Sequence, residues 1–430
     1  MFLKWINKCR LCGNPHLEEV IDLGDMPSQG FFIYKDKPPP SSRNIPTKIV
    51  RCDTKKWENA CGLVQSKVIV PPEILYSNYG YCSSVSKTMT DHLKNLNSKI
   101  REIKGNLHGE IVVDIGMNDG TFLKFYDNDV RKIGVDPSDI ASKVDGEIKV
   151  INECFPTDKL NDFLKTTINC LDGSRRIESK KVSVLTAFAC MYDILDIEMA
   201  LNAINELLMP NGIFVCEVAY LPTVLRDNLY DGLVHEHVSL FSFATLEYAL
   251  NRTRLKTFKV EKTLTNFGSL LLFVCKKECM KFDSQENLNN LYKLRLEEFN
   301  AELDESKTYN LFKDRVNQHG RDLKAKLFDL KKMGKRIHIL GASTKLNTIL
   351  GFLHIGPELI DCASERDIRK HGGSTLNGIP IISEEESRKN VDVYLIGPGH
   401  FKDEILKRES EARNRGVQFL FLLPEIELIN

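Results

Sequence analysis

Residues 110–120 read Glu-Ile-Val-Val-Asp-Ile-Gly-Met-Asn-Asp-Gly, and this stretch decides the fold. Its apolar-rich part, Ile111–Ile115, has the length of a buried strand, and the two glycines that follow it mark a turn. A helical stretch over residues 122–125 and a second strand over residues 133–136 come next. We therefore expect one strand–loop–helix–strand unit, in which the glycines let a ligand approach the backbone closely.

The second strand ends on Asp136, where Rossmann-like folds place the carboxylate that holds a ribose 2′-hydroxyl. The loop lacks the Gly-x-Gly-x-x-Gly spacing, so no pyrophosphate cradle is indicated. Asp114-x-Gly116-x-x-Asp119-Gly120 instead resembles the nucleoside-binding loop of class I S-adenosylmethionine (SAM) methyltransferases. The alternative is an ordinary strand-to-helix turn with a capping Asp. The resemblance implies these cofactor-binding residues: Asp114, Gly116, Asn118, Asp119, Gly120, Asp136 and Pro137.

The composition favours a cytoplasmic enzyme of several domains. The chain has 430 residues, 59 basic and 59 acidic, with a formal net charge of zero. This balance argues against a nucleic-acid partner or a membrane surface, and no apolar run is long enough to span a bilayer. We expect a small-molecule substrate and a monomer or homodimer. The twelve cysteines indicate reduced thiols with one metal site.

Four of these cysteines form two pairs near the N-terminus. Cys9-x-x-Cys12-Gly has the spacing of a zinc knuckle, whereas Cys52 and Cys61 are separated by a polar insert, residues 53–60. Four thiolates suit tetrahedral Zn²⁺, and a closed four-sulfur site is structural. The alternatives are four free cysteines, or His16 as a ligand in place of Cys52.

The apolar pattern after the deciding stretch continues as strands and helices. Residues 182–188 read as a central strand, residues 199–208 as a helix, and residues 213–218 as the next strand. The Leu-Leu-x-Pro-x-Gly junction between that helix and strand is frequent in class I methyltransferases. A further strand at 269–275 ends this domain.

A second strand–turn–helix unit opens at residue 336, after a long helical connection. A helix N-terminus carrying Ser343 and Lys345 could hold a phosphate, or could simply pack on its strand. The fold expected is α/β, with a central class I (Rossmann-like) methyltransferase domain between two others. The segments are a zinc-binding module (1–68), a helical connection contributing to the active site (69–105), a SAM-binding methyltransferase domain (106–280), and a C-terminal helical connection with an α/β substrate-side domain (281–430).

Two histidines flank a glutamate at His235-Glu236-His237. Histidine titrates near neutrality and can act as a general base. On an extended backbone, the two histidines would share one face and Glu236 would take the other. The alternatives are a structural histidine pair and part of a metal site.

Taken in order, these motifs resemble the three-part sugar C-methyltransferases of deoxysugar biosynthesis, which methylate C3 of a nucleotide-linked 4-keto sugar. The two cysteine pairs resemble the zinc domain of that family, Tyr81-x-Ser83-Ser84 its active-site entry, and His235-Glu236-His237 its catalytic strip. The resemblance implies His237 as the base, Glu236 as its charged neighbour, and Tyr81 as a catalytic group that binds the sugar or its enolate. It implies a nucleotide-sugar substrate held by Ser83, Ser84, His235, Ser343, Lys345 and Asn347.

The chain departs from this family pattern on the substrate side. Val234 stands where the family usually has Tyr, and Cys190 where it usually has His. The cofactor loop is intact, so methyl transfer is better supported than its acceptor atom. O-methylation of a sugar or another small molecule is the alternative reaction. A nucleotide-sugar-binding protein that has lost catalysis is the alternative of another class.

Overall fold

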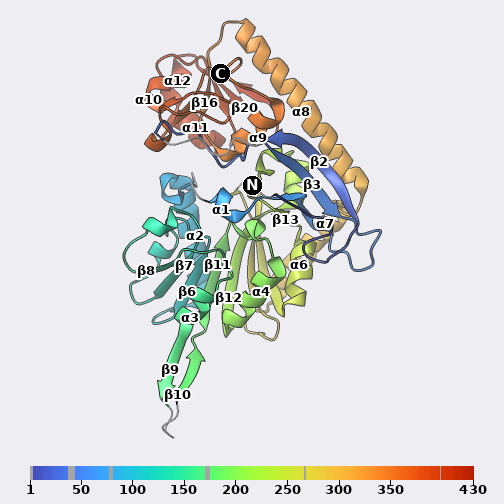
Figure 1. Ribbon diagram of the computed structural model, residues 1–430, viewed down its shortest axis with the longest axis vertical. Helices are drawn as coiled ribbons and strands as arrows, with labels where there is room; N and C mark the ends of the chain where they lie inside the picture. The colour runs from blue at the N-terminus through green and yellow to red at the C-terminus, as the bar shows by residue number, and fades with distance from the viewer. Residues whose placement is uncertain (1–2, 37–43, 77–80, 170–174, 266–267, 398) are drawn as a thin grey trace.

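A computed structural model describes residues 3–36, 44–76, 81–169, 175–265, 268–397 and 399–430. Figure 1 shows a large sheet in the lower half, the C-terminal domain above it, and the blue N-terminal strands beside the junction of the two. Within the described residues, no helix is long and apolar enough to cross a membrane.

The large sheet carries the deciding stretch at its centre. Its strand order is β14-β15-β12-β11-β6-β7-β8, and β12, β11, β6, β7 and β8 run parallel. The bounds are β6 Ile111–Ile115, β7 Arg131–Val135, β8 Ile148–Ile151, β11 Val182–Phe188, β12 Leu208–Ala219, β14 Leu255–Thr263 and β15 Ser269–Lys276. The chain runs outward in one direction from β6 and in the other from β11. The crevice between their carboxyl ends is therefore the ligand-binding position of an open α/β sheet.

The residues after β6 differ from the expectation. The helix expected over 122–125 is a single 3-10 turn, Leu123–Phe125. Asp127, Asn128 and Asp129 follow after Tyr126, and these residue types favour turns. The remaining chain is only long enough to reach β7 at Arg131.

Helices cover this sheet and connect it to its neighbours. They are α2 Lys87–Lys104, α3 Asp158–Leu164, α4 Ile197–Leu207, α5 Leu221–Arg226, α6 Phe243–Arg252 and α7 Gln285–Asn300. The sequence pattern did not indicate the hairpin of β9 Lys165–Asn169 and β10 Arg175–Ser179, which projects below the sheet in Figure 1. The Pro-Asn-Gly turn expected at 210–212 lies within β12, at a register shift against β11.

The N-terminal strands form a small sheet whose edge strand, β13, comes from the central part of the chain. The order is β13-β4-β3-β2, with β13 Ser239–Leu240, β4 Val64–Ser66, β3 Ile45–Cys52 and β2 Leu17–Met26. A separate pair joins β1 Lys4–Trp5 to β5 Val68–Ile69, and the short α1 Pro72–Leu75 follows. Because β13 begins two residues after His237, the N-terminal sheet anchors the end of the His-Glu-His segment.

The long helix α8, Ser306–Lys332, leads to a second doubly wound domain. Its sheet order is β18-β17-β16-β19-β20-β21, with β16 at the start of the winding. The bounds are β16 Ile337–Leu340, β17 Cys362–Glu365, β18 Ile381–Ser383, β19 Val393–Ile396, β20 Gln418–Phe421 and β21 Glu427–Ile429. The helices are α9 Thr344–Leu353, α10 Glu384–Ser387, α11 Lys402–Arg408 and α12 Ser410–Asn414.

Candidate active site

The glycine loop after β6 lies against the loop after β11. Gly116 has a φ of 72°, and a Cβ on it would lie 2.8 Å from Cys190 Sγ. Any other residue would therefore be strained and would collide with that side chain. The Cys190 thiol donates to the Ile115 carbonyl at 3.0 Å, which fixes the two loops together.

Asp136 shapes the turn that would face a ribose. Its two carboxylate oxygens accept the backbone N–H groups of Asn118 at 2.9 Å and Ser138 at 2.7 Å. Desolvation raises the pKa of Asp136, although the hydrogen bonds from Ser138 and Asn118 oppose the shift. Each oxygen keeps a lone pair, so the carboxylate can accept further bonds from hydroxyls.

The side chains of Asn118 and Asp119 hold the segment that carries Tyr81. Asn118 donates its amide to the Tyr81 carbonyl and accepts the Ser83 N–H at 2.9 Å. Asp119 accepts the Ser84 N–H at 2.9 Å, together with bonds from Cys82 and Thr121. The residues expected to bind the cofactor therefore lie next to those expected to bind the substrate, and the two groups are joined by hydrogen bonds within the protein. Ser83 and Ser84 use their backbones in these contacts.

Asp114 contacts the neighbouring strand. Its carboxylate accepts the Thr186 hydroxyl at 2.6 Å, and desolvation raises its pKa to about 7. The residue is 3% exposed. These contacts make it a support beneath the glycine loop, so its predicted contact with the cofactor stays a prediction.

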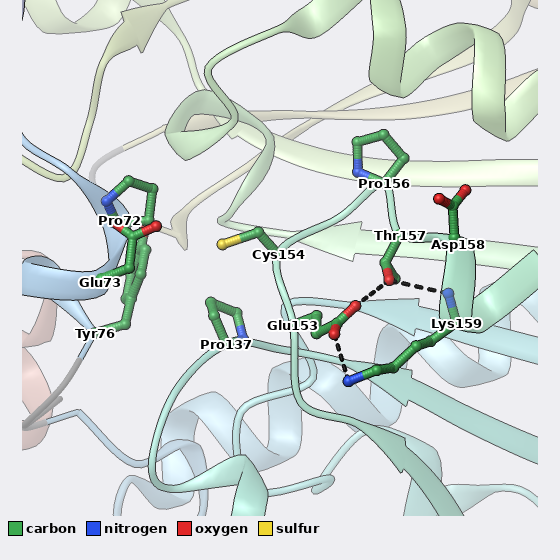
Figure 2. A pocket seen from close by; sticks show the side chains of 10 residues that line it. All are labelled: Pro72, Glu73, Tyr76, Pro137, Glu153, Cys154, Pro156, Thr157, Asp158 and Lys159. Carbon is green, nitrogen blue, oxygen red and sulfur yellow. Dashed lines mark hydrogen bonds and ion pairs between the residues drawn. The ribbon is translucent and has the colours of Figure 1, made fainter.

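A hollow of about 830 Å³ opens beside Pro137, the residue after Asp136. Figure 2 shows Pro137 and Cys154 on one side of it and Pro72 and Tyr76 of the α1 region on the other. Glu153 stands at its edge, bound to Lys159 and Thr157. The mostly apolar lining next to an acid suits a flat base attached to a ribose.

The His-Glu-His segment is a turn, so the face-sharing expected of an extended strand is wrong. The His237 N–H donates to the Val234 carbonyl at 3.1 Å, which closes the turn. His235 therefore points to the N-terminal module, where Nε2 lies 3.0 Å from the Thr47 hydroxyl. It is 2% exposed, and its Nδ1 has no hydrogen-bond partner among the described residues; its role in substrate binding stays a prediction.

His237 has the geometry of a neutral base. Its Nδ1 lies 2.8 Å from the Gly232 carbonyl, and because a carbonyl only accepts, Nδ1 carries the hydrogen. Nε2 has no hydrogen-bond partner among the described residues and keeps its lone pair. Desolvation lowers the pKa of His237 to about 4, and the charge of Lys345 adds to this shift.

Glu236 is buried beside this histidine. Its Oε1 has no hydrogen-bond partner in the described part of the chain, and desolvation raises its pKa to about 7. A Cβ on Gly30 would lie 1.9 Å from that oxygen, so any larger residue there would displace the Glu236 carboxyl. Sequence reasoning missed Gly30, although the Pro-Ser-Gln-Gly run around it indicates a tight turn.

The C-terminal domain contributes one charge and two structural contacts. Lys345 lies within electrostatic range of His237 and of the buried Asp231. Ser343 caps α9 by accepting the Leu346 N–H, and Asn347 donates its amide to the Gln29 carbonyl at 2.9 Å. Of the three residues expected to bind substrate from this domain, Lys345 is the one whose charge reaches the histidine.

Three groups near His237 were not foreseen as site residues. The Tyr192 ring packs edge-on against the His237 imidazole, with centroids 4.4 Å apart. Desolvation and then the nearby Glu236 raise the pKa of Asp193 well above its usual range. The third group is Asp231, whose Oδ2 has no partner within the described residues. No spacing pattern in the sequence marks these three residues.

Tyr81 approaches the same place. Its residue is 42% exposed, yet desolvation of the hydroxyl raises its pKa to about 12. The charged forms of Tyr81 and Tyr192 would repel each other, which places the two phenols near one another. Val234 is 3% exposed and offers no side-chain donor.

The four N-terminal cysteines come together as predicted. Their sulfurs all lie within 4.8 Å of one another, with Cys9 and Cys61 3.5 Å apart and Cys12 and Cys52 3.4 Å apart. Tetrahedral zinc with four thiolates needs sulfurs about 3.8 Å apart, so this donor set fits the ion. The 53–60 insert forms the expected surface loop, and His16 lies outside the cluster.

Three family models match the chain in sequence order. “Putative zinc binding domain” matches residues 9–76, “Methyltransferase domain” residues 89–258, and “C-methyltransferase C-terminal domain” residues 265–424. C-methyltransferase NovU from Streptomyces niveus is 26% identical to this chain, over 99% of this chain and 97% of the relative.

Two solved structures each match less than half of the chain. The CurJ carbon methyltransferase is 17% identical with a TM-score of 0.34, over 46% of this chain and 56% of that chain. Magnesium protoporphyrin IX methyltransferase from Synechocystis PCC 6803 with bound SAM is 11% identical with a TM-score of 0.31, over 46% of this chain and 86% of that chain.

Proposed function

The chain belongs to the SAM-dependent C-methyltransferases that join a zinc-binding, a methyltransferase and a C-terminal domain, and on this premise we propose that it methylates a carbon of a nucleotide-linked keto sugar. The observation that carries the proposal is the state of His237. A neutral imidazole, whose Nε2 has no partner in the part of the chain that the structure describes, stands beside the crevice at the ends of β6 and β11.

The residues around the crevice divide into a cofactor side and an acceptor side. Asp136 would bind the ribose of SAM, and the hollow beside Pro137 would hold its base. The glycine loop would let SAM approach the backbone closely. When bound, SAM supplies an electrophilic methyl group on a sulfonium. The acceptor side is lined by His237, Glu236 and Tyr81, and Lys345 adds a positive charge suited to an anionic substrate.

The chemistry follows from a keto group next to the acceptor carbon. His237 Nε2 removes the hydrogen at C3, and the C–H electron pair enters an enediolate that includes the keto oxygen. That carbon then forms a bond to the methyl group while the carbon–sulfur bond breaks, and His237 keeps the proton. Donors around the keto oxygen stabilise the developing charge, and fixed positions of the two partners lower the barrier further.

The test is hydrogen exchange at C3 of a nucleotide-linked 4-keto sugar in heavy water, with S-adenosylhomocysteine in place of SAM. His237→Asn should reduce exchange and turnover by about 10²–10⁴, the usual cost of losing a general base, while S-adenosylhomocysteine affinity stays unchanged. His354→Asn is the matched control, since its exposed, left-handed position suits Asn.

Two results would contradict the proposal in different ways. Exchange that persists in His237→Asn would remove this residue as the base. Absence of exchange in the wild type, together with a methylated hydroxyl in the product seen by NMR, would establish the O-methyltransferase alternative.

A further inference from the structure

We propose that the Tyr192 hydroxyl is the hydrogen-bond donor to the acceptor's oxygen in this site. The inference rests on the proposed function and adds a residue to its acceptor side.

Its position is set by the loop after β11. Tyr192 belongs to the 3-10 turn Met191–Asp193, which follows Cys190 directly. Cys190 holds the start of the glycine loop, because its thiol donates to the Ile115 carbonyl, as described above. Tyr192 is therefore two residues along the chain from the cysteine that contacts the glycine loop, at the edge of the sheet where the crevice opens.

The Tyr192 side chain faces the base. Its ring meets the His237 imidazole at 4.4 Å with an interplanar angle of 62°. The Tyr81 phenol lies within electrostatic range on another side. A substrate carbon that presents its hydrogen to His237 Nε2 would therefore bring the adjoining oxygen near this pair of phenols.

The hydroxyl of Tyr192 has no hydrogen-bond partner among the residues that the structure describes. The residue is 4% exposed, but its hydroxyl is not one of the fully buried, partnerless side-chain oxygens, which include those of Tyr126 and Tyr220, so a ligand can still reach it. The nearby Cys190 thiol already donates to the Ile115 carbonyl, and the Val234 side chain has no hydrogen-bond donor. The Tyr192 hydroxyl is thus a hydrogen-bond donor that remains available to a ligand.

The ionisation of Tyr192 suits this role. Desolvation, with Asp193 as the next contribution, raises the pKa of Tyr192 well above its usual range, so the phenol keeps its proton. A neutral phenol can donate to an enediolate oxygen without transferring the proton. The covalent steps of the reaction are unchanged, because the hydrogen from C3 still ends on His237.

The test compares Tyr192→Phe with Tyr126→Phe. Both tyrosines are buried, and Tyr126 also has a hydroxyl without a partner in the described chain, but it lies in the core beneath the sheet. The probe is a thymidine-diphosphate-linked 4-keto-6-deoxyhexose. The readouts are C3 exchange in heavy water, kcat for methyl transfer, and S-adenosylhomocysteine affinity.

We expect Tyr192→Phe to lower exchange and kcat by about 10²–10³, the usual loss for one oxyanion donor, with cofactor-product affinity unchanged and Tyr126→Phe equal to wild type. An active wild type with an equally active Tyr192→Phe would overturn the inference alone. A Tyr192→Phe variant that also loses S-adenosylhomocysteine affinity would overturn it in favour of a packing role. A wild type inert toward the probe and other nucleotide-linked 4-keto sugars would overturn the proposed function, and the inference with it.

Discussion

At the residue scale, one physical cause shifts the pKa values of both Glu236 and His237. Desolvation lowers the pKa of His237 to about 4 and raises that of Glu236 to about 7, because it disfavours whichever form is charged. At neutral pH the imidazole is therefore a free base. The carboxyl beside it titrates close to neutrality, near a second buried acid, Asp193.

The charge of Lys345 provides a test of the base. Lys345 disfavours the imidazolium form of His237, so it lowers the pKa of this histidine. Because the basic form is active, kcat/KM should fall as the pH drops through about 4, the pKa of His237 in the free enzyme. Lys345→Met should raise that pKa and move the acid limb to higher pH. The measurement is a pH profile of kcat/KM.

Lys389→Met is the control for this prediction, since Lys389 is an exposed lysine of the same domain. It should leave the acid limb where it is. An acid limb that stays fixed in Lys345→Met would show that another group titrates in the rate profile.

At the element scale, the zinc knuckle is connected to both loops that carry the acceptor side. Arg10, which lies between Cys9 and Cys12, donates to the Leu195 carbonyl at 2.8 Å. Its other terminal nitrogen donates to the Val238 carbonyl and to the Ser239 hydroxyl at 2.6 Å. One guanidinium thus holds the chain just after Tyr192–Asp193 and just after His237.

Arg10→Met should loosen both loops at once. Hydrogen bonds from a charged group contribute about 1.5–3 kcal/mol each, so losing those of the guanidinium should lower the melting temperature. Turnover should fall more than S-adenosylhomocysteine affinity, because the glycine loop is held by β6 and β7. The measurements are calorimetric melting, kcat and binding titration.

Arg101→Met is the comparison for Arg10→Met. Arg101 also donates to a backbone carbonyl, that of Phe125, and forms an ion pair with Asp127. It lies away from the acceptor loops, so its loss should reduce stability without slowing turnover. Equal effects of the two variants on kcat would argue against a positioning role for Arg10.

These elements also show what the sequence could and could not predict. The glycine loop with Asp136 and the Cys9–Cys12 knuckle were predictable, because local spacing determines them. The partners of His235 and Asn347 were not, because their contacts lie 188 and 318 residues away in the chain. Tyr192 carries no spacing signal, since its role depends on how one turn packs against another.

At the scale of the whole molecule, the N-terminal module lies between the other two domains. Arg10 binds it to the loops of the methyltransferase domain. Asn347 binds its 29–31 segment to the C-terminal domain, and Arg51 donates to the Asp304 carbonyl ahead of α8. The proposed acceptor side would therefore be assembled from all three parts of the chain, whereas the proposed cofactor side would be built on the large sheet.

Loss of zinc should impair methyl transfer, which needs the acceptor side, but should leave binding at the cofactor side intact. Cys12→Ser removes one of four thiolates, so metal content and the melting temperature should fall, since zinc affinity contributes directly to folding of its module. Methyl transfer should be lost, because Arg10 no longer holds the His237 loop. S-adenosylhomocysteine should still bind with an affinity close to that of the wild type, because Asp136 and the glycine loop are held by the parallel strands.

The control is Cys362→Ser, which changes a buried cysteine outside the cluster and should keep zinc and activity. Elemental analysis, calorimetry and a methyl-transfer assay measure the three effects, and full turnover in a zinc-free Cys12→Ser protein would rule out this coupling.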